Sequence, residues 1–324
     1  MKFLVFGGSG FIGIHLVKEL RLAGYEVLVA DLIGSHSHNH NFQHVDLRKY
    51  LETLSVIETY MPEIIINLAS KTDDNGVGIF DYSTNFLGPM HIIRALKACQ
   101  LIDKTHYFHF SSQYVIKPTS ELEESFADYD PYTTYGESKA IGELILRNET
   151  EISWTIFRPT AVWGEYHPSF PTGVWPLISR RLFTMPKKSP IRSYVYVGTL
   201  TKQVMKFLGI SRSKIQHEIF YLGNPPGSQE ILFDAFSKAL SKKPVRKVPI
   251  EVLSLANFIF KCFSMIGLKV PISQIQFEIL TQNYEIEINK TEEIIGKTEE
   301  DLMHSVEKTI NWYRETSKLG NPLK

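Results

Sequence analysis

Cysteine is scarce in this sequence: Cys99 and Cys262 are the two examples among 324 residues. Two cysteines cannot build the disulfide framework of a secreted scaffold, and their spacing does not match that of a zinc site. We therefore expect both to be small buried side chains in a reducing, cytoplasmic setting. A disulfide-stapled mini-protein and a cysteine-based zinc module are both excluded as classes.

An excess of charge of one sign is also missing. Lysine and arginine number 35, aspartate and glutamate number 35, and the formal net charge is zero. Without an overall positive field, the chain has no general means of attracting a polyanion. We expect no nucleic-acid partner.

Long hydrophobic runs are lacking too. The apolar run at 3–6 stops at Gly7, which is too short for the core of a signal peptide. The most apolar later stretch, 252–268, is interrupted by Asn257 and Lys261, so no membrane span is expected. This stretch predicts a buried or lid-forming helix, with a helix lying on a membrane surface as the alternative.

Short apolar strands and helices alternate through the first half of the chain. The pattern predicts strands at 2–7, 25–32, 63–70, 104–112 and 153–160, and helices at 11–24, 47–60, 85–100 and 134–149. Such alternation is typical of a parallel sheet covered on both faces, which is the doubly wound α/β fold of Rossmann type. We expect an NAD-binding domain at 1–160, to which part of 191–224 returns. Residues 161–324, rich in proline and aromatic residues, would form mainly a smaller C-terminal substrate-binding cap.

A glycine-rich turn joins the first predicted strand to the first predicted helix. Glycines at 7, 10 and 13 allow a dinucleotide's pyrophosphate to approach the backbone, and Phe11 and Ile12 open the helix whose N–H groups would face it. Asp31 ends the second strand, where a carboxylate can accept hydrogen bonds from ribose hydroxyls and would repel a 2′-phosphate. The cofactor predicted by these residues is NAD.

Tyr135 and Lys139 are four residues apart on a predicted helix and therefore share one face. A neighbouring ammonium would lower the pKa of a tyrosine and help it to act as a base near neutral pH. A simple surface pair is the alternative interpretation. Ser112, at the carboxyl end of a predicted strand, could hold the same substrate oxygen.

Several motifs together resemble the extended short-chain dehydrogenase/reductase superfamily, in its nucleotide-sugar epimerase/dehydratase branch. They are GGSGFIG at 7–13, VDL at 45–47, IINLAS at 65–70, TNFLGPMHIIRA at 84–95, FSSQYV at 110–115, YGESK at 135–139, FRPTAVWG at 157–164, YLGN at 221–224 and WYRE at 312–315. They extend over nearly the whole chain.

The resemblance implies roles for individual residues. Ser112, Tyr135 and Lys139 would be catalytic, with Lys139 also binding the nicotinamide ribose. Arg192 would bind the substrate's diphosphate, a surface arginine being the alternative. Cofactor contacts would come from Asp46 and Leu47 at the adenine, from Leu68, Ala69 and Ser70 at the middle of the cofactor, and from Pro159. Asn85 would be either a further cofactor contact or a structural asparagine.

The sequence also departs from the pattern of that family. The acid pair that dehydratases carry after the serine is replaced by Gln113 and Tyr114, so dehydration is not expected. Ala161 and Gly198 replace residues that commonly contact the substrate. We interpret Glu143 and Glu165 as solvated or helix-supporting charges, and the aromatic segment 163–175 as packing of the cap. The histidines at 36, 38, 40 and 44 predict a polar loop rather than a metal site.

The function implied is that of an NAD-dependent nucleotide-sugar epimerase, acting at C4 through a transient 4-keto sugar, in polysaccharide biosynthesis. The alternatives are an NAD(P)H-dependent 4-keto-nucleotide-sugar reductase, a steroid-type dehydrogenase and, from another class, a non-catalytic NAD-binding module. The resemblance also implies a homodimer formed through the helices at 85–100 and 134–149.

Overall fold

A computed structural model describes residues 1–34, 41–73, 76–118, 129–168, 170, 174–265 and 274–318 of the chain. These residues form two compact units. Unit 1 comprises Met1–Val162, Val197–Gly223 and Ile288–Thr298. Unit 2 comprises Trp163–Tyr196, Asn224–Glu287 and Glu299–Lys324. The chain therefore leaves unit 1 and returns to it twice.

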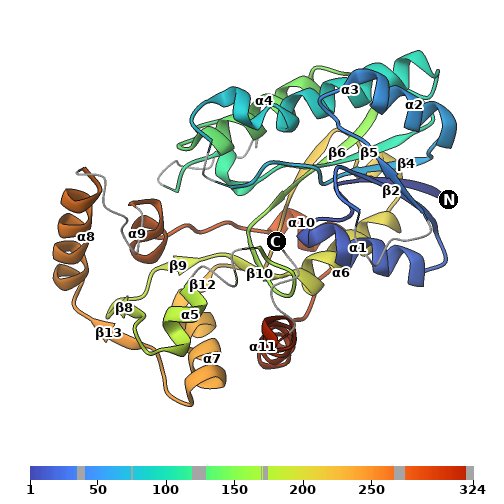
Figure 1. Cartoon of the computed structure of the whole chain (residues 1–324). Helices are drawn as coiled ribbons and strands as arrows, with labels where there is room; N and C mark the ends of the chain where they lie inside the picture. The colour runs from blue at the N-terminus through green and yellow to red at the C-terminus, as the bar shows by residue number, and fades with distance from the viewer. Residues whose placement is uncertain are drawn as a thin grey trace. The chain divides into compact units, whose positions relative to one another are not determined.

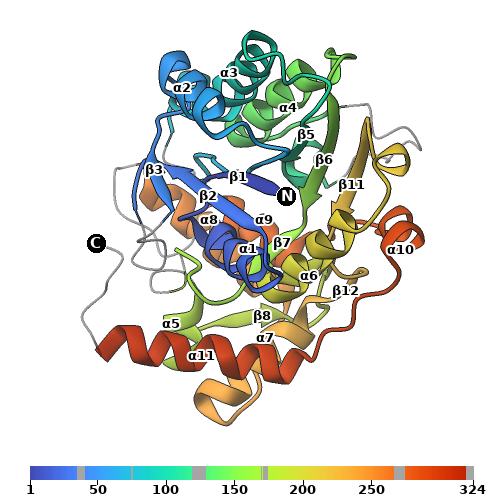
Figure 2. The ribbon, with the colours of Figure 1, turned by 90° about the vertical axis from the view of Figure 1, so that its right-hand side faces the viewer.

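Unit 1 is built on a seven-stranded sheet whose order is β11-β6-β5-β4-β1-β2-β3. Neighbouring strands are parallel throughout, and Figures 1 and 2 show them side by side. The strands are β1 (Lys2–Phe6), β2 (Glu26–Asp31), β3 (Phe42–His44), β4 (Ile64–Asn67), β5 (His106–Phe110), β6 (Ser153–Pro159) and β11 (Glu218–Leu222). The order reverses direction between β1 and β4, which is where doubly wound folds bind their ligands. The predicted fold class is confirmed.

Helices cover both faces of this sheet, because its strands are apolar on both sides. In Figure 1, α2, α3 and α4 lie over one face, while α1 and α6 lie under the other. The helices of unit 1 are α1 (Phe11–Leu22), α2 (Tyr50–Tyr60), α3 (Thr84–Ala98), α4 (Thr134–Arg147), α6 (Val197–Leu208) and α10 (Asn289–Ile295), with 3-10 turns η2 (Ile79–Tyr82), η3 (Gln113–Val115) and η4 (Arg212–Lys214). The core beneath α2–α4 includes the buried side chains of Leu4, Ile65, Ile92, Leu96 and Ile156.

The five strands and four helices expected in the first half are all present, with ends that differ by a few residues. The helix expected at 47–60 begins at Tyr50, because Asp46–Lys49 form a turn in which Lys49 N donates to Asp46 O (2.8 Å). β3 was not predicted, since three residues give too short a pattern to recognise. His44 lies at its end, and His36, His38 and His40 lie outside the described residues.

Unit 2 contains shorter elements around a separate core. They are β7 (Ala161–Trp163), which begins in unit 1, α5 (Val174–Ser179), β8 (Thr184–Pro186), β9 (Ile191–Arg192), β10 (Tyr194–Tyr196), β12 (Gly227–Ser228), α7 (Gln229–Ser241), β13 (Arg246–Val248), α8 (Ile250–Met265), α9 (Gln274–Thr281) and α11 (Leu302–Lys318). The core includes Ile178, Phe183, Met185, Phe233 and Leu280. Trp175 packs on Phe236 with ring centroids 4.1 Å apart, so the aromatic segment serves packing, as expected.

Helix α8 is more exposed than the sequence led us to expect. Between residues 250 and 263 every side chain is exposed or half-buried, so the expectation of a buried helix is wrong. The cause is that α9 is the main element that packs against α8, and one short helix cannot cover all of its apolar surface. Among the described residues, no helix is both long enough and apolar enough to cross a membrane. Residues 266–268 of the expected helix lie outside the described residues.

Candidate cofactor and catalytic site

The glycine-rich turn lies where the ends of β1, β2 and β4 meet, at the reversal point of the sheet. Gly7 has a φ of 76°, and a Cβ there would lie 2.4 Å from the backbone N of Ala69. A Cβ at Gly13 would lie 2.3 Å from the carbonyl oxygen of Gly7. Both positions therefore require glycine, the first for its backbone conformation and the second for the close packing of α1 on the turn.

The start of α1 fits the diphosphate of a dinucleotide. Gly10 is the N-cap and offers no side-chain hydrogen bond to the first turn, which Phe11 and Ile12 open. The hydroxyl of Ser9 is buried and has no hydrogen-bond partner within the described protein. N–H groups at a helix N-terminus and an unused hydroxyl are donors suited to phosphate oxygens.

Asp31 joins the second strand to the glycine turn. Its Oδ2 accepts a hydrogen bond from the backbone N–H of Ser9 (3.0 Å), and its Oδ1 accepts one from that of Leu32 (2.7 Å). A carboxylate has about four acceptor positions, so these two hydrogen bonds do not by themselves exclude ribose hydroxyls. The residue is placed as the sequence predicted and also stabilises the turn itself.

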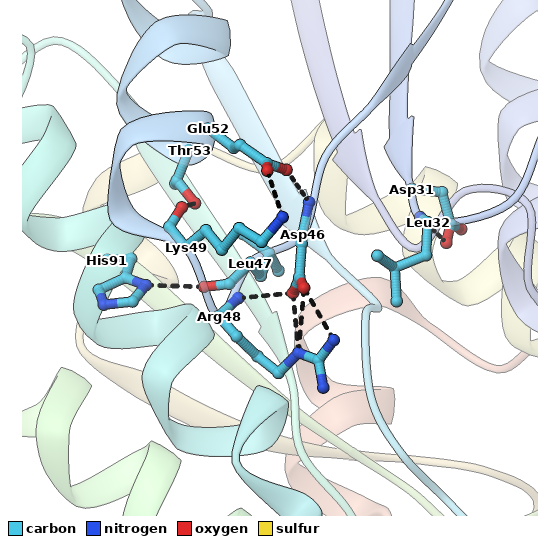
Figure 3. A network of polar contacts seen from close by, with 9 residues as sticks. All are labelled: Asp31, Leu32, Asp46, Leu47, Arg48, Lys49, Glu52, Thr53 and His91. Atoms are coloured by element: carbon cyan, nitrogen blue, oxygen red, sulfur yellow. Dashed lines mark hydrogen bonds and ion pairs between the residues drawn. The ribbon is translucent and has the colours of Figure 1, made fainter.

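Asp46 and Leu47, predicted at the adenine, belong to the polar network drawn in Figure 3. The Asp46 carboxylate is buried and accepts from the Arg48 guanidinium, with an N–O distance of 2.8 Å from Nη2 to Oδ2. That hydrogen bond holds the pKa of Asp46 below its usual value. Leu47 O accepts from Nδ1 of His91 (2.7 Å), which fixes the loop onto α3. Arg48 therefore stabilises the ionised form of the Asp46 carboxylate.

The loop after β4 is held by Asn85 at the start of α3. Asn85 Oδ1 accepts from Ser70 Oγ (2.9 Å) and from Lys71 N (2.9 Å), while Nδ2 donates to Lys71 O (3.0 Å) and to Ser138 Oγ (2.8 Å). These four bonds use the full capacity of the amide. Asn85 therefore orients the Leu68–Ser70 loop relative to α4.

Tyr135 lies in the first turn of α4, beside Ser112 at the end of β5. The rings of Tyr82 and Tyr114 flank it, with centroids 6.3 and 6.2 Å from that of Tyr135. Burial raises the pKa of Tyr135 to about 12, while hydrogen bonding to the side chains of Ser112 and Ser70 acts in the opposite direction. The structure thus brings the predicted serine and tyrosine together and adds Ser70 to them.

Lys139 lies one turn further along the same face of α4. It is 2% exposed, and its Nζ donates to the backbone oxygen of Phe110 (2.8 Å). Burial lowers the pKa of Lys139 to about 7, and the nearby Glu143 carboxylate partly opposes this. The exposed-pair alternative is therefore wrong, since an ammonium buried at this depth is not a solvated surface charge.

One expectation about this pair is not met in the protein alone. We predicted that Lys139 would lower the pKa of Tyr135, but burial dominates and raises it. The same burial depletes the charge on Lys139, so the lysine contributes less field than a solvated ammonium would. A base at this position needs a further positive charge close to it.

Helix α4 approaches its neighbours through two glycines that the sequence analysis did not single out as functional. A Cβ at Gly136 would lie 2.1 Å from Tyr114 O, and a Cβ at Gly142 would lie 2.4 Å from Asn85 O. A glycine inside a helix is unfavourable unless a close contact requires it. The two glycines within the predicted helix were therefore a signal in the sequence that α4 packs closely against its neighbours. They let Tyr135 and Lys139 sit against η3 and α3.

Glu143, which we interpreted as a solvated or helix-supporting charge, is fully buried. It forms a two-pronged ion pair with Arg158 of β6, with distances of 2.9 Å to Nε and 2.7 Å to Nη2. Glu165 is also buried and accepts from the hydroxyl of Tyr196 (3.0 Å). Both expectations of solvated carboxylates are wrong, because each carboxylate meets a partner distant in sequence.

The remaining predicted residues are placed as follows. Pro159 ends β6 opposite Leu222 of β11, Gln113 and Tyr114 belong to η3, Ala161 starts β7 and Gly198 lies in α6. Arg192, in unit 2, is 3% exposed, so the surface-arginine alternative is wrong. One of its N–H groups donates to Gln282 O (3.0 Å), and its guanidinium lies over the ring of Tyr284. Its remaining donors leave capacity for an anion.

A parallel doubly wound sheet, a glycine turn at its reversal point, and a Ser–Tyr–Lys group whose serine and lysine are buried define the class: a short-chain dehydrogenase/reductase of the extended kind. The chain belongs to the NAD dependent epimerase/dehydratase family, whose sequence model matches residues 3–223. NAD is therefore its cofactor, in agreement with the prediction.

Individual relatives are distant. The putative UDP-glucose 4-epimerase of Methanocaldococcus jannaschii is 24% identical over 97% of this chain and 99% of its own length. The N-acetyl-alpha-D-glucosaminyl-diphospho-ditrans,octacis-undecaprenol 4-epimerase of Escherichia coli is 24% identical over 84% of this chain and 83% of its own. The UDP-glucose 4-epimerase of Thermotoga maritima, solved with UDP-glucose, superposes with a TM-score of 0.73 at 19% identity, over 98% of this chain and 100% of its own, and so shows the fold.

Proposed function

We propose that this protein is an NAD-dependent epimerase that inverts C4 of a sugar carried on a diphosphate, through a transient 4-keto sugar. The observation that carries the proposal is the grouping of Ser112, Tyr135 and the buried Lys139 at the carboxyl edge of the sheet. Relatives named as 4-epimerases, aligned over most of the chain, support the choice of reaction.

In this proposal Tyr135 exchanges a proton with the C4 hydroxyl of the sugar. Bound NAD would supply hydride acceptance and hydride return at C4 within one turnover, so no cofactor would be consumed. Ser112 holds the reacting oxygen, because its hydroxyl lies within hydrogen-bonding reach of Tyr135. The enzyme's own task is thus to position the sugar and to move one proton.

Lys139 would serve two roles in the loaded site. Its Nζ can bind the ribose beside the nicotinamide, a contact that would replace or join the bond to Phe110 O. Protonated Lys139 and the cationic nicotinamide ring would together supply the positive charge that the chain alone lacks, lowering the pKa of Tyr135 toward neutrality. The raised pKa in the protein alone therefore fits a base that is activated only when NAD is present.

The substrate class we propose is a nucleotide sugar, used in polysaccharide biosynthesis. Arg192 is the proposed contact to the diphosphate, because its guanidinium keeps donors beyond the one given to Gln282 O. The sugar diphosphate group is shared by UDP-glucose and by the lipid-linked substrate in the name of the Escherichia coli relative. Gln113 and Tyr114, in place of an acid pair, disfavour dehydration.

The test is turnover without a change of redox state. Purified protein is denatured to release any bound nucleotide, and native protein is then incubated with UDP-hexoses while absorbance at the nicotinamide band and the sugar products are followed. We expect bound NAD and C4 isomers with constant absorbance. Net consumption of NADH or NADPH with a 4-keto sugar would instead establish a reductase, and NAD binding without any turnover would establish a non-catalytic module.

Tyr135→Phe tests the residue assignment. We expect it to lower kcat by about 100-fold or more while NAD is retained, since general base catalysis contributes factors of this size. Tyr25→Phe, which removes a hydroxyl from a tyrosine packed on Phe3, is the matched control and should keep full activity. Equal activity of the two variants would refute the role of Tyr135.

We also propose that the protein is a homodimer joined through α3 and α4. Exposed Leu144 on α4 is one apolar side chain that such a contact would cover. Light scattering at micromolar concentration should give twice the mass of 37.2 kDa, and Leu144→Arg should shift it toward the monomer. A wild-type protein of monomer mass would reject the proposal.

A further inference from the structure

Helix α8 carries apolar side chains along its outward side. Val252, Leu255, Phe258, Ile259 and Phe263, here called the apolar arc, are between 42% and 63% exposed. At 100° per residue these five positions fall within an arc of about 140°. The half-buried residues Leu253, Ala256, Asn257 and Phe260 fall on the other side of the helix. The apolar arc is thus a surface stripe along α8, interrupted near its N-terminal end by exposed Glu251, which falls within it.

Cations gather where the chain enters this helix. Lys242, Lys243 and Arg246 are exposed and precede α8 directly, and Lys187 and Lys188 are exposed at the end of β8. The backbone N of Lys187 donates to Val248 O (2.9 Å), which places this pair beside the last residue of β13. These five side chains are here called the basic cluster. Figure 1 shows β8 beside β13, which leads into α8.

The charge of the basic cluster is not neutralised by ion pairs among the described residues. Within the described residues none of its five side chains has an ion-pair partner, whereas the neighbouring Lys247 is paired with Glu230. Lys261, also exposed, lies at the flank of the apolar arc, and Glu251 is the one carboxylate in α8. The surface therefore combines an apolar stripe with a local excess of positive charge, although the whole chain is neutral.

We propose that α8 and the basic cluster form a surface that docks on an anionic lipid bilayer, with α8 lying in the plane of the interface. An apolar helical stripe flanked by lysine and arginine matches the chemistry of such an interface, where acyl chains accept the stripe and anionic headgroups attract the cations. Lysines at its edge can extend toward the headgroups while their stems stay in apolar surroundings. The residues of this surface belong to unit 2, and none of them is among the proposed catalytic residues of unit 1.

The full-length protein is tested by flotation with vesicles of phosphatidylcholine, with and without about one third phosphatidylglycerol. We expect binding to the anionic vesicles that falls as salt rises, and at least about tenfold weaker binding to neutral vesicles. Absence of binding to anionic vesicles would overturn the proposal.

Two variants locate the contact. Leu255→Gln/Phe258→Gln and Lys187→Gln/Lys188→Gln/Arg246→Gln should each weaken binding by about tenfold or more. Their matched controls, Leu22→Gln/Leu51→Gln on exposed positions of α1 and α2 and Lys18→Gln/Lys202→Gln/Lys214→Gln, should bind as the wild type does. Circular dichroism and melting curves confirm that each variant is folded. If a folded α8 variant binds unchanged, the proposal fails.

A probe inside the stripe distinguishes lipid from protein partners. Cys262 is exposed and falls within the arc, so the expectation that it is buried is wrong, whereas Cys99 is half-buried and can be replaced by serine. A polarity-sensitive thiol label at Cys262 should shift to the blue when anionic vesicles are added and not on dilution. A label that responds to protein concentration alone, together with loss of dimers in Leu255→Gln/Phe258→Gln, would assign the stripe to a second copy of the chain and overturn the proposal.

Discussion

Glu143 and Arg158 pair through two hydrogen bonds with both side chains fully buried, and they join helix α4 to strand β6. Tyr129 OH also donates to Glu143 (2.9 Å), and Arg158 donates to Tyr221 OH (3.2 Å). Glu143 follows Lys139 by one turn of α4. The pair therefore fixes the helix that carries the proposed catalytic residues.

Breaking this pair from one side should destabilise the protein strongly. We expect Glu143→Gln to lower the free energy of unfolding by about 3–5 kcal/mol, because Arg158 would remain buried without its counter-charge. Denaturant unfolding measures the effect, and Glu149→Gln, which removes a partly exposed ion pair with Lys97, is the control at under about 1 kcal/mol. An equal loss in the free energy of unfolding for the two variants would show that the buried pair stabilises the protein no more than the Lys97–Glu149 pair does.

Lys139 should make stability depend on pH in a stated direction. Its pKa falls from 10.5 to about 7 on folding, so the unfolded chain binds more protons between these values and stability rises with pH across that window. Replacing the buried amine removes this cost, so Lys139→Met should be more stable at pH 7, by roughly 3 kcal/mol, and inactive. Melting curves from pH 6 to 10 on both proteins check this, with Lys202→Met as the exposed control. A wild-type curve parallel to that of Lys139→Met would contradict it.

Gly142 should not accept even one added methyl group. A Cβ there would come within 2.4 Å of Asn85 O, so Gly142→Ala must push α4 away from α3. We expect a loss of about 1–3 kcal/mol in the free energy of unfolding and a lower kcat, despite the better helix propensity of alanine. Gly227→Ala, where the added Cβ meets no atom within 4 Å, should change stability by less than about 0.5 kcal/mol. Stabilisation by Gly142→Ala would show that the helices can separate freely.

Asp31 should set the preference for NAD over NADP. Asp31→Asn keeps an oxygen that can accept from Ser9 N but removes the charge that would repel a 2′-phosphate. We expect NADP binding to tighten by about tenfold and NAD binding to weaken severalfold. Calorimetric titration with both cofactors measures this, and Asp103→Asn, an exposed site, controls for net charge. An unchanged ratio of the affinities for NAD and NADP would show that Asp31 does not determine the preference.

Local pattern was sufficient to predict the strands, helices and glycine turn of the first half, because each depends on neighbours a few residues away. The burial of Glu143 was not foreseen, since its partner Arg158 lies on another element. The helix at 252–268 was misjudged for a related reason: its apolar residues would suit a buried helix, and only tertiary packing shows that its outward side stays uncovered.

The pKa of Tyr135 could not be read from the Tyr–Lys spacing either. The spacing fixes which residues share a face, but the balance between burial and charge depends on Phe110, Ser70 and Ser112, which come from other segments. The residues of the site were therefore predictable, and their protonation was not.

The edge strand β11 and helix α10 come late in the sequence, which affects how unit 1 folds during synthesis. β11 pairs with β6 in register, as with Ile219 opposite Ile156, and the last segment of unit 1 ends at Thr298. A ribosome must therefore release the chain as far as Leu222, about two thirds of its length, before β11 can close the sheet edge, and unit 1 is complete only once Thr298 has been released. Until then β6 presents an unpaired, apolar border that nascent-chain chaperones would have to shield. Cutting the gene after codon 162 would leave a fragment with that border permanently open.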